Sequence, residues 1–187
     1  VGSQFDDFLW AGVGNDTVVG GSGNDMLFGD LGADSLYGNA GNDTFYIDST
    51  DADFNGGADY DVVYITTGPG MTINMLATQV EWIADYAGGN DVITGGGAGQ
   101  VVVFAGGGSD NVVGGAGNDF LWGEAGNDVI GGAVGDDTLV GGTGADKLAG
   151  GSGNDTLFLS SGGGGDGAAD IADFSNSSGW GIDFIYD

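Results

Sequence analysis

Aspartate recurs at every ninth residue over two long parts of this chain, and evenly spaced carboxylates can hold a hard metal ion. Each Asp side chain offers two oxygen atoms, which are the ligands that Ca²⁺ prefers when it takes six to eight partners at about 2.3–2.6 Å. Mg²⁺ fits such a set less well, because it demands near-octahedral geometry and keeps its waters. The spacing predicts calcium ligands at Asp7, Asp16, Asp25, Asp34, Asp43, Asp61, Asp91, Asp110, Asp119, Asp128, Asp137, Asp146 and Asp155.

The aspartates belong to a nine-residue unit with the pattern G-G-x-G-x-D-x-U-x, in which U is a large apolar residue. The unit is clearest at residues 20–28, 114–122 and 150–158. Its glycines permit a tight turn with positive φ, and its last three residues alternate as in a short strand. Turn propensity alone would explain the Asn-Asp pairs, but not the phase that they keep over whole blocks. The U positions are Leu9, Val18, Leu27, Leu36, Phe45, Val63, Val112, Leu121, Ile130, Leu139, Leu148 and Leu157.

Two such units make one coil of eighteen residues, with a strand on each side and a glycine-rich turn at each end. Stacked coils form two parallel sheets whose U side chains meet in a thin core. We therefore predict an all-β fold, a parallel β-roll solenoid of 18-residue coils with calcium in the turns and a C-terminal cap. We expect one domain over residues 1–187, made of a repeat block at 1–61, irregular coils at 62–87, a second block at 88–158, and a cap with a possible secretion signal at 159–187.

The pattern is broken at several positions. Ala52 stands where an Asp is expected, so we predict that its row of carboxylates ends at Asp34. Gln100 also stands in an Asp position, which argues against a calcium site there. The register is lost between residues 62 and 87, although residues 71–75 alternate like a strand.

Stacking places residues that are eighteen apart directly above one another, so like charges meet. Two carboxylates about 5 Å apart repel by roughly 3 kcal/mol at an effective dielectric constant of about 20. Several such pairs rival the roughly 5–15 kcal/mol by which a domain is typically stable. The chain has 28 acidic residues and a single basic one, Lys147, so the neutralising cation must come from solution. Pairing each Asp with its neighbour in the next coil predicts about seven to nine calcium ions.

The composition excludes several classes of function. With a net charge of −27, the chain cannot neutralise nucleic-acid phosphates, and an anionic membrane surface would repel it. It has no Cys for thiolate sites and no His for imidazole metal sites or a Ser-His-Asp triad. No apolar run approaches about 18 residues, so we expect no membrane insertion. Because carboxylates are the only catalytic groups left and half of the 28 are predicted calcium ligands, we also expect no enzymatic activity.

The repeats resemble those of the RTX (hemolysin-type calcium-binding) family over roughly residues 2–61 and 88–158. The resemblance implies a parallel β-roll, export in the unfolded state by type I secretion machinery, and folding in extracellular calcium. Residues 170–174 are similar to the D-x-I-x-D-F motif that often follows such repeats, and this motif adds Asp173 to the expected ligands. The acidic and apolar end, residues 182–187, is similar to an uncleaved secretion signal.

An aromatic series is expected along one outer face, because Trp10, Phe28, Tyr46 and Tyr64 are eighteen residues apart. Such a stripe either forms an interface or stacks on itself and stiffens the sheet. The first coil, which begins at Gly2, has no cap in the sequence and would present unpaired backbone groups. We therefore expect the chain to associate with itself, either end to end or through the aromatic face.

Two functions agree with these features. The first is a non-catalytic, calcium-folded structural module outside the cell that assembles with itself, as in a surface layer or a filament. The alternative is the C-terminal calcium-binding and type I secretion module of a larger RTX exoprotein, such as a protease, lipase, epimerase or toxin. Self-association in calcium discriminates between the two.

Overall fold

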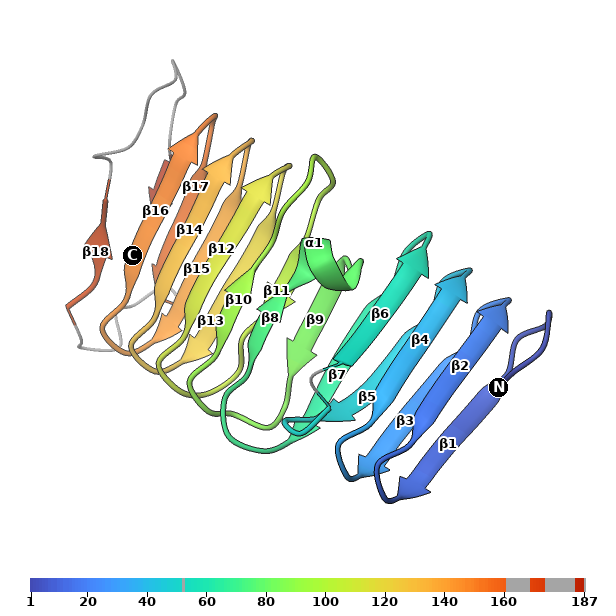
Figure 1. Ribbon diagram of the computed structural model, residues 1–187. Coiled ribbons are helices and arrows are strands. Elements are labelled where there is room, and N and C mark those ends of the chain that lie inside the picture. The colour runs from blue at the N-terminus through green and yellow to red at the C-terminus, as the bar shows by residue number, and fades with distance from the viewer. Residues whose placement is uncertain (52, 161–168, 174–183, 187) are drawn as a thin grey trace. The chain divides into compact units, whose positions relative to one another are not determined.

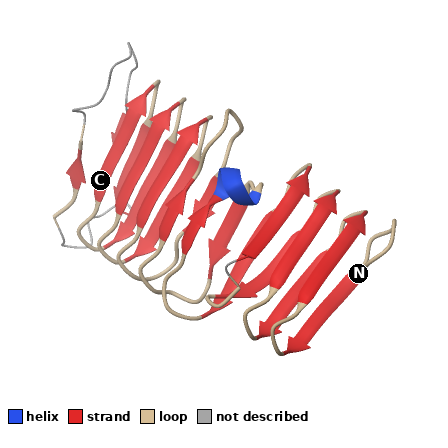
Figure 2. Cartoon of the chain, viewed as in Figure 1, coloured by secondary structure: helices blue, strands red, loops and turns tan. Residues whose placement is uncertain are grey.

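The fold is a parallel β-solenoid of short strands and tight turns (Figure 1). The structure, a computed structural model, describes residues 1–51, 53–160, 169–173 and 184–186. Within these residues, a four-residue helix is the only helical element, and all the other regular elements are strands joined by turns and loops (Figure 2). Strand partners lie eighteen residues apart in most coils. The predicted all-β class and the 18-residue coil are therefore confirmed, whereas calcium in the turns stays a prediction.

The chain forms two compact units. Unit 1 comprises Val1–Pro69 and Met75–Ala87, and unit 2 comprises Gly70–Asn74 and Gly88–Asp187. The domain boundaries inferred from the sequence are not tested by this division and stay a prediction.

Unit 1 contains two parallel sheets, with the strand orders β1-β3-β5-β7-β9 and β2-β4-β6. Helix α1 (Met75–Thr78) contacts β6. Equivalent repeat positions pair across neighbouring strands, as Leu9 does with Leu27. The strands are β1 (Phe8–Val13), β2 (Thr17–Ser22), β3 (Met26–Leu31), β4 (Ser35–Ala40), β5 (Thr44–Asp48), β6 (Asp53–Ala58), β7 (Val62–Thr67) and β9 (Trp82–Asp85).

Unit 2 repeats this arrangement, with the strand orders β11-β13-β15-β17-β19 and β18-β16-β14-β12-β10-β8. All its strand pairs are parallel. The strands are β8 (Thr72–Asn74), β10 (Val92–Thr94), β11 (Val102–Phe104), β12 (Asn111–Ala116), β13 (Phe120–Ala125), β14 (Val129–Val134), β15 (Thr138–Thr143), β16 (Lys147–Ser152), β17 (Thr156–Ser160), β18 (Ile171–Ala172) and β19 (Phe184–Tyr186).

The core of each unit lies between its sheets and contains the U side chains of both, as the alternation in x-U-x requires. Leu27 and Phe45 in unit 1 and Leu121 and Leu157 in unit 2 have no exposed surface. Leu9 is less buried, because it lies in the first coil and is covered from one side. The neighbours of each U residue point away from the core.

The irregular segment loses the 18-residue interval, as expected, but its strands continue to pair in parallel with the regular sheet of unit 1. Val62 of β7 pairs with Thr44 of β5 on one side and with Trp82 of β9 on the other. The second step is twenty residues long, and the extra length is taken up in the connection that contains α1. The strand predicted at residues 71–75 is confirmed as β8.

Most of the predicted cap and secretion signal, residues 159–187, lies outside the described residues. Within the described part, β18 pairs with β16 and β19 pairs with β17, so both strands continue the sheets of unit 2. None of the helices in the described part of the chain has the length and apolar character that a membrane span requires.

Candidate metal centre

The predicted aspartates form continuous rows along the turns of each unit. Apart from Asp7 and Asp16, which begin their rows, each one accepts a hydrogen bond, through Oδ1, from the backbone N–H of the equivalent residue one coil earlier. The N···O distances in the two examples Asp25–Asp43 and Asp119–Asp137 are both 2.8 Å. The rows are Asp7-Asp25-Asp43-Asp61 and Asp16-Asp34 in unit 1, and Asp91-Asp110-Asp128-Asp146 and Asp119-Asp137-Asp155 in unit 2.

The second carboxylate oxygen, Oδ2, is buried in these rows and has no hydrogen-bond donor among the described residues. A buried oxygen atom that carries charge and accepts no hydrogen bond is costly, so its presence calls for a partner that the protein chain does not supply. This holds for the Oδ2 atoms of Asp25, Asp34, Asp43, Asp61, Asp91, Asp119, Asp128 and Asp137.

A glycine five residues before most of the row aspartates leaves open the space into which Oδ2 points. A Cβ atom at Gly132 would collide with Oδ2 of Asp137 and would lie 2.6 Å from the carbonyl oxygen of Gly150 in the next coil. Gly123 stands in the same relation to Asp128. Glycine is required here because a carboxylate oxygen and a carbonyl oxygen converge on the space beside its Cα.

This donor set fits calcium. Within the described residues, no group of three acidic side chains gathers at one point. Each turn of a row instead offers carboxylates from two successive coils together with backbone carbonyl oxygens. Hard oxygen donors of this kind match the coordination that Ca²⁺ prefers. The aspartates of the rows would hold the ion, and the ion would supply the positive charge that the buried oxygens lack.

A second series of side chains cross-links the coils on the outer side of the turns. The residue that precedes a row aspartate accepts, through Oδ1, the backbone N–H of the residue one coil later. Asn24 does so with Asn42, and Asn127 does so with Ala145, at 2.9 and 2.8 Å. The direction is opposite to that of the aspartate rows, so each turn is tied to both of its neighbours. The Asn of the repeat therefore has a structural role independent of metal.

Burial makes four of the row carboxylates hard to ionise in the absence of a cation. Desolvation raises the pKa of Asp43 to about 6 and that of Asp61 to about 7, and like charge from the neighbouring carboxylates adds to the shift. The backbone N–H that each one accepts acts in the opposite direction. In unit 2, burial likewise raises the pKa of Asp128 to about 6 and that of Asp137 to about 7.

These pKa values predict that the calcium-free fold is more stable in mild acid than at neutral pH. An unfolded Asp releases its proton near pH 4, whereas the folded Asp61 and Asp137 hold theirs up to about pH 7. Stability in chelator should therefore fall as the pH rises from about 4 to 7. Thermal unfolding in excess chelator at pH 5 and pH 8 checks this. Higher stability at pH 8 would contradict the expected sign.

Asp51 extends the second row of unit 1, so the expectation that this row ends at Asp34 is wrong. The backbone N–H of Asp34 donates to Oδ1 of Asp51 at 2.9 Å, and the Asp51 side chain is fully buried. Its Oδ2 accepts the N–H of Asp48, also at 2.9 Å. The irregular pairing of β5 with β7 at residues 47 and 48 changes the path of the chain there, so a strict count of eighteen residues misses Asp51.

In unit 2, the structure differs from the sequence-based expectation at two further positions. Asp170 accepts the N–H of Asp146 at 3.0 Å and so continues the row, whereas Asp173 lies elsewhere and forms an ion pair with Lys147 at 2.9 Å. Phe174, which completes the motif cited for Asp173, lies outside the described residues. One coil before Asp119, the Asp position is occupied by Val101 and not by Gln100: the N–H of Val101 donates to Asp119, so no carboxylate precedes Asp119 in that row.

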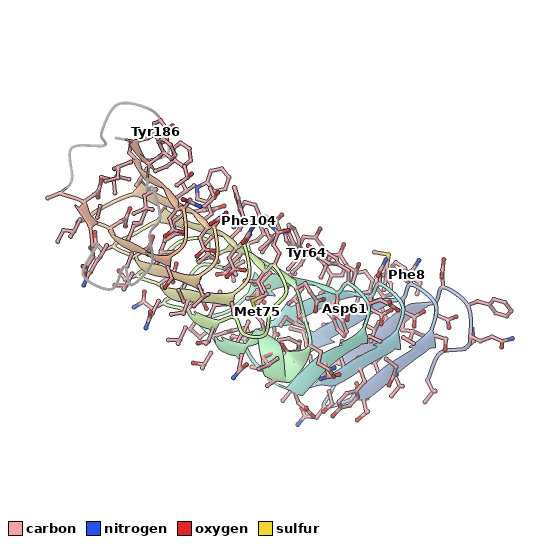
Figure 3. All side chains as sticks on the ribbon, turned by 90° about the horizontal axis from the view of Figure 1, so that it is seen from above. Phe8, Asp61, Tyr64, Met75, Phe104 and Tyr186 are labelled. Carbon is pink, nitrogen blue, oxygen red and sulfur yellow. The ribbon has the colours of Figure 1, made fainter. Side chains whose placement is uncertain are left out.

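The predicted aromatic stripe is present on the outer face of unit 1, where Figure 3 shows Phe8 and Tyr64 on the same side. The rings of Phe28 and Tyr46 are stacked with centroids 4.4 Å apart, and those of Tyr46 and Tyr64 with centroids 5.1 Å apart. Trp10 packs edge-on against Phe28 and is 66% exposed. The rings therefore stack on one another and still leave an exposed apolar surface.

Comparison with known families finds one match. The profile described as the RTX calcium-binding nonapeptide repeat matches four segments, residues 1–27, 19–51, 104–139 and 131–167, which together cover more than half of the chain. These segments contain most of the aspartate rows described above. A search of curated proteins finds no relative of this chain.

Proposed function

Because the chain belongs to the family of the RTX calcium-binding nonapeptide repeat, we propose that it is an extracellular structural module that folds when calcium fills its turns. The observation that supports this proposal is the row of buried Oδ2 atoms, such as those of Asp43 and Asp137, that have no hydrogen-bond donor within the described part of the chain and lie beside carbonyl oxygens. Calcium would neutralise these oxygens, and its binding energy would become folding energy.

The number and affinity of the ions follow from the same arrangement. Pairing of row aspartates in successive coils gives about seven to nine ions, with dissociation constants on the order of 10⁻⁴–10⁻³ M, as in other extracellular modules. At such affinities the chain would stay unfolded in calcium-poor surroundings and would fold outside the cell. This supports export in the unfolded state through the type I secretion machinery.

The module is of the calcium-binding structural kind, and we propose that it acts without catalysis by assembling with copies of itself. The aromatic face supports this part of the proposal, because Phe8 and Trp10 are 60% and 66% exposed. At the other end of the face, Tyr60, Val62, Tyr64 and Trp82 line a shallow hollow. Exposed aromatic side chains in a continuous patch are typical of interaction surfaces.

Assembly predicts that the variant Trp10→Ser weakens self-association, because it removes a ring of the face that is 66% exposed. Leu31→Ser is the matched control, since Leu31 is 65% exposed on the same sheet but belongs to no ring contact among the described residues. Sedimentation velocity in millimolar calcium over a range of protein concentrations provides the measurement. We expect large species from the native chain and from Leu31→Ser, and a shift toward monomer for Trp10→Ser.

A calcium-loaded native chain that stays monomeric at every concentration would contradict the assembly role. That result would favour the alternative, in which the same calcium-folded roll is the C-terminal secretion module of a larger exoprotein.

A further inference from the structure

The first aspartate row of unit 1 does not end at Asp61, the last Asp that the repeat pattern places in it. The backbone N–H of Asp61 donates to a carboxylate oxygen of Glu81, with an N···O distance of 2.8 Å. This bond is the equivalent of the one that Asp61 itself accepts from Asp43, also at 2.8 Å. Glu81 thus occupies the next position of the row, twenty residues on and with a different acid.

The space beside Asp61 is built like the regular positions, but from different residues. In the regular coil before it, a Cβ atom at Gly38 would collide with Oδ2 of Asp43 and lie 2.6 Å from the carbonyl oxygen of Gly56. In the irregular coil, a Cβ atom at Gly56 would collide with Oδ2 of Asp61 and with the carbonyl oxygen of Gln79. A carboxylate oxygen and a carbonyl oxygen therefore converge in both places.

The short helix α1 explains how an irregular chain reaches this arrangement. The N–H of Val80 donates to the carbonyl of Met75, and Asn55 of β6 donates to the carbonyl of Ala77. Gln79 follows in the left-handed region, with φ 52°, which is costly for a residue other than glycine. Such strain is retained where the surrounding structure needs the backbone in that direction.

The side chain of Glu81 compensates for the changed path. In the regular coil, the carbonyl of Gly56 precedes the row carboxylate of Asp61 by five residues, whereas the carbonyl of Gln79 precedes Glu81 by only two. Glutamate has one methylene group more than aspartate, so its carboxylate can still reach the N–H of Asp61. The structure thus accounts for a Glu where the repeat has Asp.

The charges at this place require a cation from solution. Asp61 is fully buried, its Oδ2 has no donor among the described residues, and Glu81 brings a second negative charge next to it. The only Lys or Arg of the chain, Lys147, is paired with Asp173. We propose that Asp61, Glu81 and the Gln79 carbonyl bind a calcium ion, so that the row of sites continues through the coil that departs from the repeat. This inference depends on the proposed calcium-binding function.

The variant Glu81→Gln tests the site with little risk to the fold. A Gln side chain keeps an oxygen that can accept the N–H of Asp61, but it lacks the charge that calcium needs. Glu124→Gln is the matched control, because Glu124 is the only other Glu of the chain and is exposed on β13. Equilibrium dialysis against calcium should show one ion fewer, or one ion bound about 10- to 100-fold more weakly, for Glu81→Gln alone.

Terbium luminescence gives an independent measurement of the same site. Tyr60 and Trp82 are the only Tyr or Trp residues adjacent in sequence to a row carboxylate, so they should sensitise a Tb³⁺ ion bound between Asp61 and Glu81. We expect Trp82→Phe to lower the sensitised emission strongly while the calcium stoichiometry is unchanged. Glu81→Gln should lower both the sensitised emission and the number of calcium ions bound.

The outcomes separate this inference from the proposed function. If the native chain binds several calcium ions and Glu81→Gln binds as many with the same affinity, the Glu81 site is overturned while the function stands. If the native chain binds no calcium at all, the proposed function is overturned and the Glu81 site with it.

Discussion

In a chelating buffer at neutral pH, the chain is expected to lose its β-roll and to expand. The carboxylates of Asp25, Asp43 and Asp61 are buried in successive coils, and none of the residues that the structure describes donates a hydrogen bond to their Oδ2 atoms. Each pair of charges about 5 Å apart costs roughly 3 kcal/mol at an effective dielectric constant of about 20. A few such pairs rival the roughly 5–15 kcal/mol that keeps a typical domain folded. Burial of the apolar core alone should therefore be insufficient to keep the calcium-free chain folded at neutral pH.

Far-UV circular dichroism during a calcium titration measures this effect. We expect a cooperative gain of β-structure with a midpoint on the order of 10⁻⁴–10⁻³ M. Magnesium at the same concentration is the control for simple screening, and it should fail because its coordination does not fit the turns. A chelated chain that keeps its full β-signal at neutral pH would contradict the expected calcium dependence.

The variant Gly132→Ala is expected to lose calcium binding at one turn, although it adds only a methyl group. The new Cβ would collide with Oδ2 of Asp137 and would approach the Gly150 carbonyl oxygen. Gly132 does not have positive φ, so the damage would come from the occupied space and not from backbone strain. Forcing a methyl group into packed space typically costs about 1–3 kcal/mol, which is about a 5- to 150-fold loss in a binding constant.

The neighbouring residue provides a matched control. A Cβ atom at Gly131 would meet only the Ala149 carbonyl oxygen, at an ordinary contact distance of 3.9 Å, and Gly131 also lacks positive φ. Gly131→Ala should therefore leave the calcium midpoint nearly unchanged, whereas Gly132→Ala should raise it. Equal midpoints for the two variants, measured by calcium titration, would show that the space beside Gly132 does not bind the ion.

The regular part of the fold could be predicted from the sequence because every level of the pattern agrees. The nine-residue period places apolar residues such as Leu27 and Leu121 on one side of each strand, and both are fully buried. The same period stacks residues eighteen apart, so Asp110 and Asp128 could be assigned to one row before the structure was known. Two short repeats per coil leave few alternative arrangements for such a chain.

The remaining row residues could not be found by counting, because the chain path changes at each of them. Asp51 follows an irregular strand pairing, Glu81 follows a helical turn, and Asp170 lies 24 residues after Asp146. In each case, a carboxylate still accepts the N–H of a residue one coil earlier. The row of carboxylates therefore continues in space, although the sequence interval between its members is 17, 20 or 24 residues at these places.

Calcium binding in the turns is tested most directly by anomalous diffraction from crystals grown in millimolar calcium. We expect anomalous peaks along the turns, with the oxygens of Asp43 and Gly56 around one of them and those of Asp137 and Gly150 around another. Turns without anomalous peaks, in which the Oδ2 atoms instead accept hydrogen bonds from ordered water, would contradict this expectation.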